Sequence, residues 1–483
     1  MMNLRPVQKI LGVLLALFSG TMVPPLVLSL IYRDGMHLGF LIAITIILAI
    51  GIALYLPVRR NREDLRLRDG FIVVVMFWSV LGVSGSIPLF LVSDPHLSVV
   101  DAVFESISGL TTTGATVISG IDTLPESILF YRQMLQWLGG MGIIVLAVAI
   151  LPMLGIGGMQ LYRAETPGPV KDSKLTPRIT ETAKALWVIY LTLTIVCTLA
   201  FYGLGMSLFD AVGHAFSTVS IGGFSTHDAS LGYFDSAAIE TVTIVFMLIA
   251  GVNFSLHFTA WRSRDFSIYR DDSECTAYFQ LLAASAVVCV VVLALHSYAP
   301  LPEALRLGVF QAVSIGTTTG FTTDQFHAWP AFLPVMLLFA AFVGGCAGST
   351  GGGLKVIRVT LLFKQGMREI KRLIHPSAVL SIKMGGRPVP ARVVDAVWGF
   401  FATYLAVFGI LMLSVMNAGL DQVSAFSAVA ASLNNLGPGL GDVALNYGEI
   451  SDQAKVLLCF AMLLGRLEIF TFLVLLTPAF WRS

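Results

Sequence analysis

The feature that most constrains this chain is a short glycine-centred stretch that recurs four times in an otherwise apolar sequence. The four glycines that end these stretches lie about 100 residues apart, and each stretch follows a short, mostly apolar run. Recurrence at a long, nearly constant period indicates four copies of one structural unit. The four stretches are Thr111–Thr112–Thr113–Gly114, Ser220–Ile221–Gly222–Gly223, Thr317–Thr318–Thr319–Gly320 and Asn434–Asn435–Leu436–Gly437.

The composition is typical of an integral membrane protein. Of 483 residues, 56% are hydrophobic and 12% are charged. The net charge of +1 gives no reason to expect a nucleic-acid partner. The five cysteines are scattered through apolar runs, and the eight histidines form no metal-ligand motif. We therefore predict that the chain is not an enzyme and carries no cofactor, and that lipid surrounds it.

Each unit follows one plan: a long apolar helix, a short run, a glycine stretch and a second long apolar helix. A full membrane span needs about 20 residues, so the short runs reach half way and are predicted to be re-entrant pore helices. Two further apolar runs, over residues 10–31 and 38–56, precede the units. A cleaved signal peptide is the alternative for the first run, but that run lacks a clear cleavage site.

This plan predicts an all-α integral membrane protein with ten full spans and four half-spans. We expect an N-terminal two-helix hairpin over residues 1–68, followed by four helix–pore-loop–helix repeats over residues 69–160, 183–262, 275–372 and 392–483. The second helices are expected over residues 132–154, 237–260, 332–363 and 455–478, with the third of them interrupted.

The distribution of basic residues sets the orientation. Of the 30 lysines and arginines, Arg33, Arg132, Arg306 and Lys455 fall on one side of the predicted membrane, and Arg466 falls within a span. The others lie on the opposite side, which the positive-inside rule makes cytoplasmic, together with both termini. Every repeat has two full spans, so all four glycine stretches face the outside around one axis. Their carbonyl groups, together with the negative ends of the pore helices, describe a cation filter.

At these residues the chain resembles the TrkH/KtrB/HKT superfamily of potassium transporters, and most closely the bacterial TrkH type. The motifs TTTGAT, VSIGGFST, IGTTTGFTT and NNLGPGLG carry the resemblance, which covers the whole length. It implies potassium uptake across the bacterial inner membrane through a pseudo-fourfold pore, with K⁺ as the transported ion. Related proteins with serine at the first filter glycine tend to admit sodium, whereas all four positions are glycine here. The resemblance also implies a homodimer that works with a cytosolic nucleotide-binding regulatory subunit of the TrkA type, responsive to NAD or ATP.

The four stretches differ from one another, so fourfold symmetry is expected to be approximate. Thr113, Gly222, Thr319 and Leu436 occupy the position before the glycine. We expect the innermost ion sites to hold ions best, at Thr111/Thr112, Ser220/Ile221, Thr317/Thr318 and Asn434/Asn435. For Asn434 and Asn435 a helix-capping role is an alternative that is compatible with ion binding.

A glycine-rich interruption of the third repeat's second helix is the predicted gate. Six glycines in ten residues, Gly344, Gly345, Gly348, Gly351, Gly352 and Gly353, cannot hold a stable helix, since each costs about 1 kcal/mol relative to alanine. The alternatives are close helix packing through small residues and, less plausibly, a nucleotide-binding loop. Arg466 is expected beside the gate, where it forms a positive barrier; a structural salt bridge is the alternative. The resemblance to TrkH-type transporters implies the same arrangement, in which an intramembrane loop is the gate and an arginine lies beside it.

Other functions fit the sequence less well. A divalent-cation channel would need acidic filter residues, and none of the four stretches contains one. A solute symporter with inverted repeats needs units with an odd number of spans. A membrane enzyme would need a convergent catalytic set. A less selective K⁺/Na⁺ transporter stays open, as does the choice between channel-like flux and proton- or sodium-coupled symport.

Overall fold

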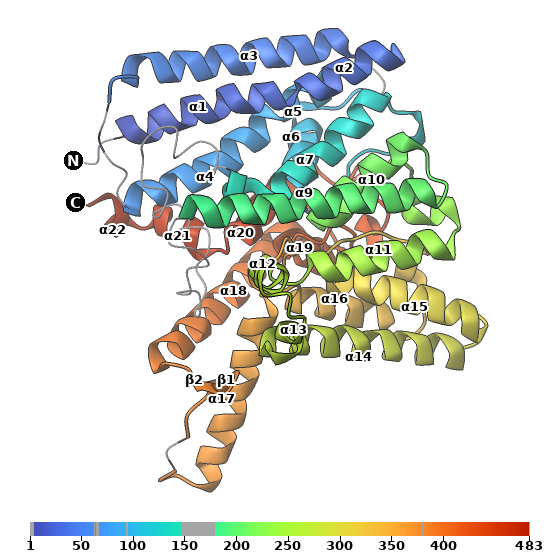
Figure 1. Ribbon diagram of the computed structural model, residues 1–483, viewed down its shortest axis with the longest axis vertical. Helices are drawn as coiled ribbons and strands as arrows, with labels where there is room; N and C mark the ends of the chain where they lie inside the picture. The colour runs from blue at the N-terminus through green and yellow to red at the C-terminus, as the bar shows by residue number, and fades with distance from the viewer. Residues whose placement is uncertain are drawn as a thin grey trace.

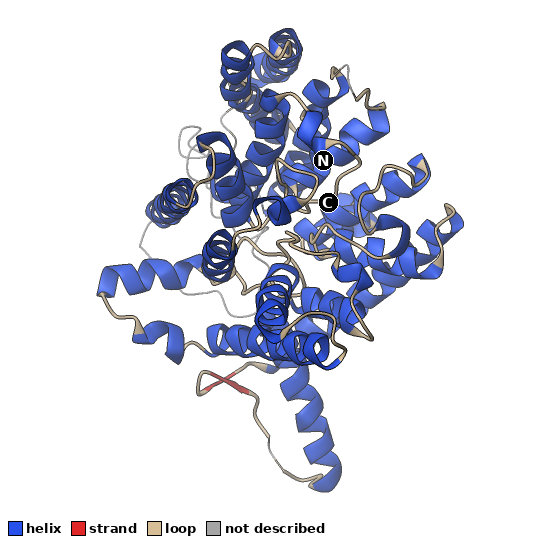
Figure 2. Cartoon of the chain, turned by 90° about the vertical axis from the view of Figure 1, so that its right-hand side faces the viewer, coloured by secondary structure: helices blue, strands red, loops and turns tan. Residues whose placement is uncertain are grey.

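The computed structural model describes residues 4–61, 63, 67–92, 95–145, 179–378 and 380–482. Throughout these ranges the regular structure is helical, apart from one antiparallel pair of short strands, β1 (Lys383–Met384) and β2 (Arg387–Pro388). The long helices lie side by side (Figure 1), and loops gather among their ends in the centre of the end-on view (Figure 2). This confirms the predicted all-α integral membrane fold.

Six continuous stretches in the described ranges are long and apolar enough to cross a membrane. They are α1 with α2 (Arg5–Thr21, Val23–Tyr32), α3 (His37–Tyr55), α4 with α5 (Leu67–Ser84, Ser86–Phe90), α9 (Ile179–Gly203), α14 (Ser273–Leu295) and α18 (Ala391–Asn417). The first two form the N-terminal hairpin, and each of the others opens one repeat. Large apolar side chains such as Leu199, Val287 and Ile410 are exposed on them, as expected of a lipid-facing surface.

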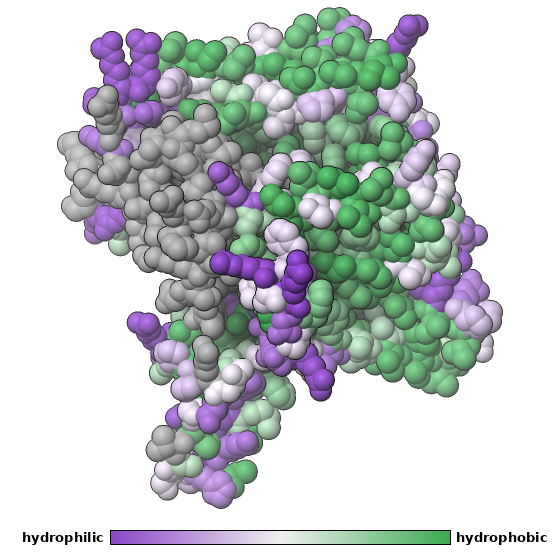
Figure 3. All heavy atoms as spheres, viewed as in Figure 1, coloured by the Kyte–Doolittle hydropathy of each residue, from purple (hydrophilic) through white to green (hydrophobic). Residues whose placement is uncertain are grey.

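The space-filling view supports the same assignment. In Figure 3 apolar residues form a broad area from the top of the face to its lower right, and polar residues gather along the right-hand margin, near the centre and on the projecting part below. A bilayer needs an apolar surface of this kind.

Four shorter helices precede the glycine stretches, close to the predicted half-spans. They are α6 (Val99–Leu110), α10 (Leu208–Ser220), α15 (Leu301–Gly316) and α19 (Gln422–Leu433). Ser98, Ser207 and Asp421 cap three of them by accepting a hydrogen bond from a backbone N–H in the first turn. The caps satisfy backbone groups that the short helices would otherwise leave unpaired.

The second helices of the repeats differ from the prediction. In the second repeat α11 (Ala237–Ala250) and α12 (Phe254–Ser263) meet at 92°, and in the fourth repeat α20 (Asp452–Arg466) and α21 (Phe470–Leu476) meet at 114°. The expectation that these two helices are continuous was wrong. Asn253 caps α12 through the backbone N–H of Ser255, and Glu468 and Ile469 adopt positive φ angles. No proline or glycine run marks either break in the sequence, so the change of direction depends on what the broken ends contact.

The other two second helices are α7 (Glu126–Val145) in the first repeat and α16 (Leu333–Val343) with α17 (Val356–Ile374) in the third. The predicted end of the first at residue 154 lies outside the described residues. The third is interrupted as predicted. Short helices complete the connections: α13 (Ser267–Asp271), α22 (Pro478–Trp481), η1 (Leu56–Val58), η2 (Ile121–Thr123), η4 (Ser230–Phe234), η5 (Phe326–Ala328) and η6 (Gly441–Val443).

Ion pairs join neighbouring repeats near the starts of the short helices. Arg306 of α15 contacts Glu240 of α11 and Asp235, with 2.8 Å between nitrogen and oxygen in both pairs. Lys455 of α20 contacts Asp101 of α6 at 2.6 Å. Glu240 and Lys455 are buried, so losing Arg306 or Asp101 would leave a buried charge uncompensated, which makes these two pairs sensitive to change.

The N-terminal hairpin closes through a glycine contact between α1 and α3. A β-carbon on Gly12 would lie 2.8 Å from the carbonyl oxygen of Gly51, so the two helices touch backbone to backbone. We predict that Gly12→Val forces them apart and destabilises the protein by about 1–3 kcal/mol. Thermal unfolding in detergent would show a lower midpoint. Gly20→Val is the matched control, because no atom lies within 4 Å of the added carbon there, and an equal loss in both variants would contradict the prediction.

Candidate pore and intramembrane gate

All four short helices end with the same backbone geometry. The residue just before each glycine donates its N–H to a carbonyl five residues earlier, at 2.8, 2.8, 2.8 and 2.7 Å in chain order. The residue before that one has a positive φ in every copy: Thr112, 57°; Ile221, 56°; Thr318, 69°; and Asn435, 53°. This is a Schellman ending in which the left-handed position, usually glycine, holds a larger residue. The four residues at this position thus share one strained backbone conformation.

The four glycines after these endings also have positive φ angles, between 79° and 99°. A β-carbon on Gly114 would overlap the carbonyl oxygen of Gly222 in the next repeat. The same overlap relates Gly223 to Thr319 and Gly320 to Leu436. At Gly437 the added carbon would lie 2.6 Å from the carbonyl oxygen of Thr113. Each loop therefore packs on the next and the fourth on the first, which closes a ring.

This ring has the chemistry of a site for a dehydrated monovalent cation. Each repeat contributes a backbone carbonyl to it, and the C-terminal ends of α6, α10, α15 and α19, which carry partial negative charge, converge on it. The sixteen residues of the four stretches are buried, except that Gly114, Gly223 and Gly320 are half-buried. No carboxylate belongs to the four stretches.

Some polar side chains of the ring bond to one another, and others bond to the helices around it. The hydroxyl groups of Thr111 and Thr113 lie 2.8 Å apart, and those of Thr317 and Thr319 lie 2.7 Å apart. Asn435 Nδ2 donates to Thr113 Oγ1 at 3.0 Å and so ties the fourth repeat to the first. Asn434 is the C-cap residue of α19, and its Oδ1 accepts from the Tyr404 hydroxyl at 2.8 Å.

Several residues that support the ring were not singled out in the sequence. Gln136 Nε2 donates to the Gly222 carbonyl at 2.6 Å, and the Tyr447 hydroxyl donates to the Gly437 carbonyl at 2.8 Å. Glu105 is fully buried, pairs with Arg132 and accepts from the backbone N–H of Val117 at 3.0 Å. Polar and ionisable residues inside apolar runs are expected to be functional, and that signal could have identified them.

The glycine-rich interruption between α16 and α17 lies against the side of the ring at which the short helices end, here called the inner side. Gly352 donates its N–H to Thr318 Oγ1 at 2.7 Å, and Gly353 donates to the Asn434 carbonyl at 3.1 Å. Thr350 Oγ1 donates to the Val219 carbonyl at 3.1 Å. The segment therefore contacts the ends of the short helices of the second, third and fourth repeats.

Arg466 connects this segment to the first repeat. It is the last residue of α20, at the bend, and its Nη1 lies 3.4 Å from both Thr112 Oγ1 and the Thr350 carbonyl. Its Nη2 donates to the Gly139 carbonyl, and its guanidinium lies 5.0 Å from the centre of the Trp78 ring. The carboxylate near it in sequence, Glu468, pairs with Arg358 instead.

A second cation, which the sequence analysis missed, lies in the interruption itself. Lys355 is 9% exposed, has a φ of 77°, and donates from Nζ to the Gly351 carbonyl. Together with Arg466 it places positive charge on the inner side of the ring.

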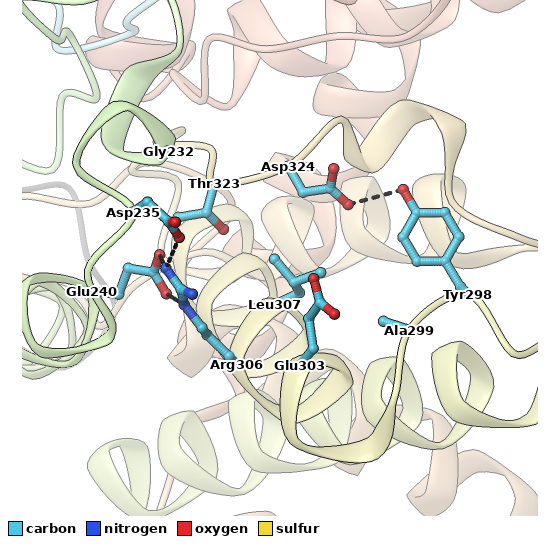
Figure 4. Close-up of a pocket in the computed structure, with 10 residues that line it drawn as sticks. All are labelled: Gly232, Asp235, Glu240, Tyr298, Ala299, Glu303, Arg306, Leu307, Thr323 and Asp324. Carbon is cyan, nitrogen blue, oxygen red and sulfur yellow. Dashed lines mark hydrogen bonds and ion pairs between the residues drawn. The ribbon is translucent and has the colours of Figure 1, made fainter.

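Beside the outer side of the third loop lies a cavity of about 320 Å³ (Figure 4). Thr323 and Asp324, which follow Gly320, line it together with Asp235, Glu240, Glu303 and Arg306. Arg306 pairs with two of the four carboxylates, and Asp324 accepts from the Tyr298 hydroxyl at 3.0 Å. Carboxylates that outnumber cations at a recess raise the local concentration of cations.

Comparison with known proteins agrees with this architecture. A family model described as TrkH, cation transport protein, matches residues 37–483. The chain belongs to the TrkH family. It is 59% identical over 485 residues to the Trk system potassium uptake protein TrkH of Vibrio parahaemolyticus serotype O3:K6, and 55% identical over 483 residues to that of Escherichia coli K12. Both matches cover all of both chains.

A solved structure of the family has the same fold. The crystal structure of the potassium transporter TrkH from Vibrio parahaemolyticus superimposes with a TM-score of 0.91 at 56% identity, covering 100% of both chains. The family is one of transporters, so the expectation that the chain is not an enzyme is confirmed.

The ring geometry predicts the effect of Gly114→Ser. The added side chain would overlap the Gly222 carbonyl and occupy a φ of +79°, at a cost of about 1–2 kcal/mol. We expect the preference for potassium over sodium to fall roughly tenfold, while the protein still folds. The degree to which sodium inhibits rubidium uptake into vesicles would measure this preference. Gly419→Ser is the control, with a φ of +112° but no atom within 4 Å. Unchanged discrimination in the Gly114 variant would refute the assignment.

Proposed function

We propose that this chain takes up potassium ions across the bacterial inner membrane through the closed ring of the four glycine loops. The observation that carries the proposal is ring closure, in which each loop packs through its glycine on a carbonyl of the next. The relatives named above are potassium uptake proteins, which supports K⁺ as the ion. Both termini lie at the same edge of the helix bundle in Figure 1, in keeping with two cytoplasmic ends.

In this proposal the four repeats span residues 69–160, 183–262, 275–372 and 392–483, and the sixteen residues of the four stretches form the selectivity filter. The inner positions, at the Schellman endings, hold ions best because the helix ends converge there. The proposal is tested by rubidium uptake into vesicles that contain the purified protein, with and without a proton gradient. Uptake that sodium inhibits as strongly as potassium would favour the less selective alternative.

The interruption between α16 and α17 is proposed as the gate. It contacts the inner ends of three short helices directly and the first repeat through Arg466. Backbone groups at this depth must be satisfied by protein or water, and here protein groups satisfy several of them. A segment that covers the inner side of the filter obstructs ion passage until α17, which continues from it, moves away.

We predict that deleting residues 345–351 raises basal rubidium flux and leaves selectivity unchanged. The deletion suits the structure, because Gly344 already lies against Gly352, which shortens the gap that the new peptide bond has to close. Stopped-flow or tracer flux on the reconstituted protein would measure the change. A deletion variant that folds but conducts no faster than the parent would rule the segment out as the barrier.

A second prediction concerns Arg466. Arg466→Ala removes a positive charge on the inner side of the ring and one link between the gate and the first repeat, so we expect several-fold faster basal flux. Arg262→Ala, at an exposed position near the end of α12, is the control for loss of a positive charge. If the Arg466 variant loses folded protein, with no change in flux per molecule, a structural role is favoured.

The surface of α17 fits the proposed partners. This helix and the β1–β2 hairpin project from the bundle (Figure 1), and four apolar side chains with helical spacing are exposed along α17: Phe363, Met367, Ile370 and Ile374. We propose that a second copy of the chain covers this stripe, giving a homodimer. A cytosolic nucleotide-binding subunit of the TrkA type would then control the gate through α17, whose first residue, Val356, directly follows the interruption.

A further inference from the structure

A buried glutamate outside the filter contacts both the proposed gate and the helix that follows it. Glu274 is the second residue of α14 and is 7% exposed. Its Oε1 accepts a hydrogen bond from the backbone N–H of Ala347 at 2.6 Å and a second from that of Ile357 at 3.2 Å. Ala347 lies inside the glycine-rich interruption, and Ile357 is the second residue of α17. One carboxylate oxygen thus joins the gate segment to the start of the helix that follows it.

Two helix N-termini meet at this carboxylate. Glu274 lies in the first turn of α14, and Ile357 lies in the first turn of α17, so two helix N-termini direct their partial positive charge toward it. Hydrogen bonds from backbone N–H groups to a charged acceptor are roughly twice as strong as those between neutral groups. The link is therefore among the stronger ones that hold the segment.

The remaining anchors near Ala347 connect it to the second repeat. Cys346 donates its N–H to the Gly251 carbonyl at 2.9 Å, and Phe254 donates to the Gly348 carbonyl at 3.0 Å. Both partners, Gly251 and Phe254, lie at the break between α11 and α12 and not in α17. Two contacts couple the segment to α17 instead: Val356 donates its N–H to the Gly345 carbonyl at 3.2 Å, and Glu274 bonds to both Ala347 and Ile357.

We infer that Glu274 is a positioning residue that holds the gate segment in its closed position, a role called the latch here, and links opening of the gate to movement of α17. The inference rests on the proposed gate. In the latched state Ala347 and Ile357 share one acceptor, so the segment cannot leave the inner side of the ring without losing a charged hydrogen bond. Movement of α17 breaks the hydrogen bond to Ile357, and because α17 continues from the segment, the same movement pulls Ala347 away from the carboxylate.

The test compares three single variants in vesicles without any regulatory subunit. Glu274→Ala removes both hydrogen bonds and is expected to raise basal rubidium flux roughly tenfold, as suits the loss of charged hydrogen bonds. Glu274→Gln keeps an acceptor oxygen but loses the charge, so an intermediate flux is expected. The ratio of rubidium to sodium flux stays at the parent value in both, because the filter is untouched.

Asp272→Ala is the matched control. Asp272 caps the same end of α14 by accepting from the Cys275 N–H at 2.7 Å, so its loss loosens that helix end without removing a hydrogen bond from the gate. Parent-like flux in this variant supports the latch. Equal acceleration in the Asp272 and Glu274 variants would overturn it, since fraying of α14 would then explain both.

Combination with the deletion of residues 345–351 separates the two proposals. If the deletion does not accelerate flux, the gate itself is wrong. If the deletion accelerates flux but Glu274→Ala does not, the gate stands and the latch is refuted. If both accelerate flux, adding Glu274→Ala to the deletion should change nothing further, because Ala347 is absent. Additive acceleration would show that Glu274 acts elsewhere and would overturn the latch.

Discussion

The contact between the glycine of one loop and the carbonyl of the next repeat is the interaction on which the rest of the structure depends. It allows four separate loops to close into one ring, because the missing β-carbon leaves room for a backbone oxygen. A side chain at any of these positions would push two repeats apart. The short helices, the spans around them and the ion pairs between repeats all keep these four contacts in register.

The need to satisfy backbone polar groups inside a membrane explains the irregular parts of the fold. Within the described residues three of the second helices are interrupted, and the broken ends contact one another. The carbonyl of Gly251, freed at the break between α11 and α12, accepts the N–H of Cys346 from the gate segment, and Phe254 bonds to Gly348 in return. Each irregular segment thus supplies the hydrogen bonds that the other requires.

The charged side chains near the ring bond to different kinds of group on its two sides. Near the outer face, Arg306 and Lys455 are paired with carboxylates of neighbouring repeats, and the cavity beside the third loop carries more carboxylates than cations. On the other side of the ring Arg466 bonds to the backbone carbonyls of Gly139 and Thr350, and Lys355 bonds to that of Gly351.

The sequence by itself determined the elements of this protein: the apolar spans, the four short helices and the four glycine stretches follow from hydrophobic length and from a repeat that needs no structure to be seen. It also located the interruption between α16 and α17, because a run of glycines cannot remain helical. Only the tertiary structure decided that α11 and α20 end where they do, that Gln136 and Tyr447 hold filter carbonyls, and that Glu274 reaches the gate. These features depend on contacts between residues from about ten to more than eighty positions apart, and local propensity carries no information about such contacts.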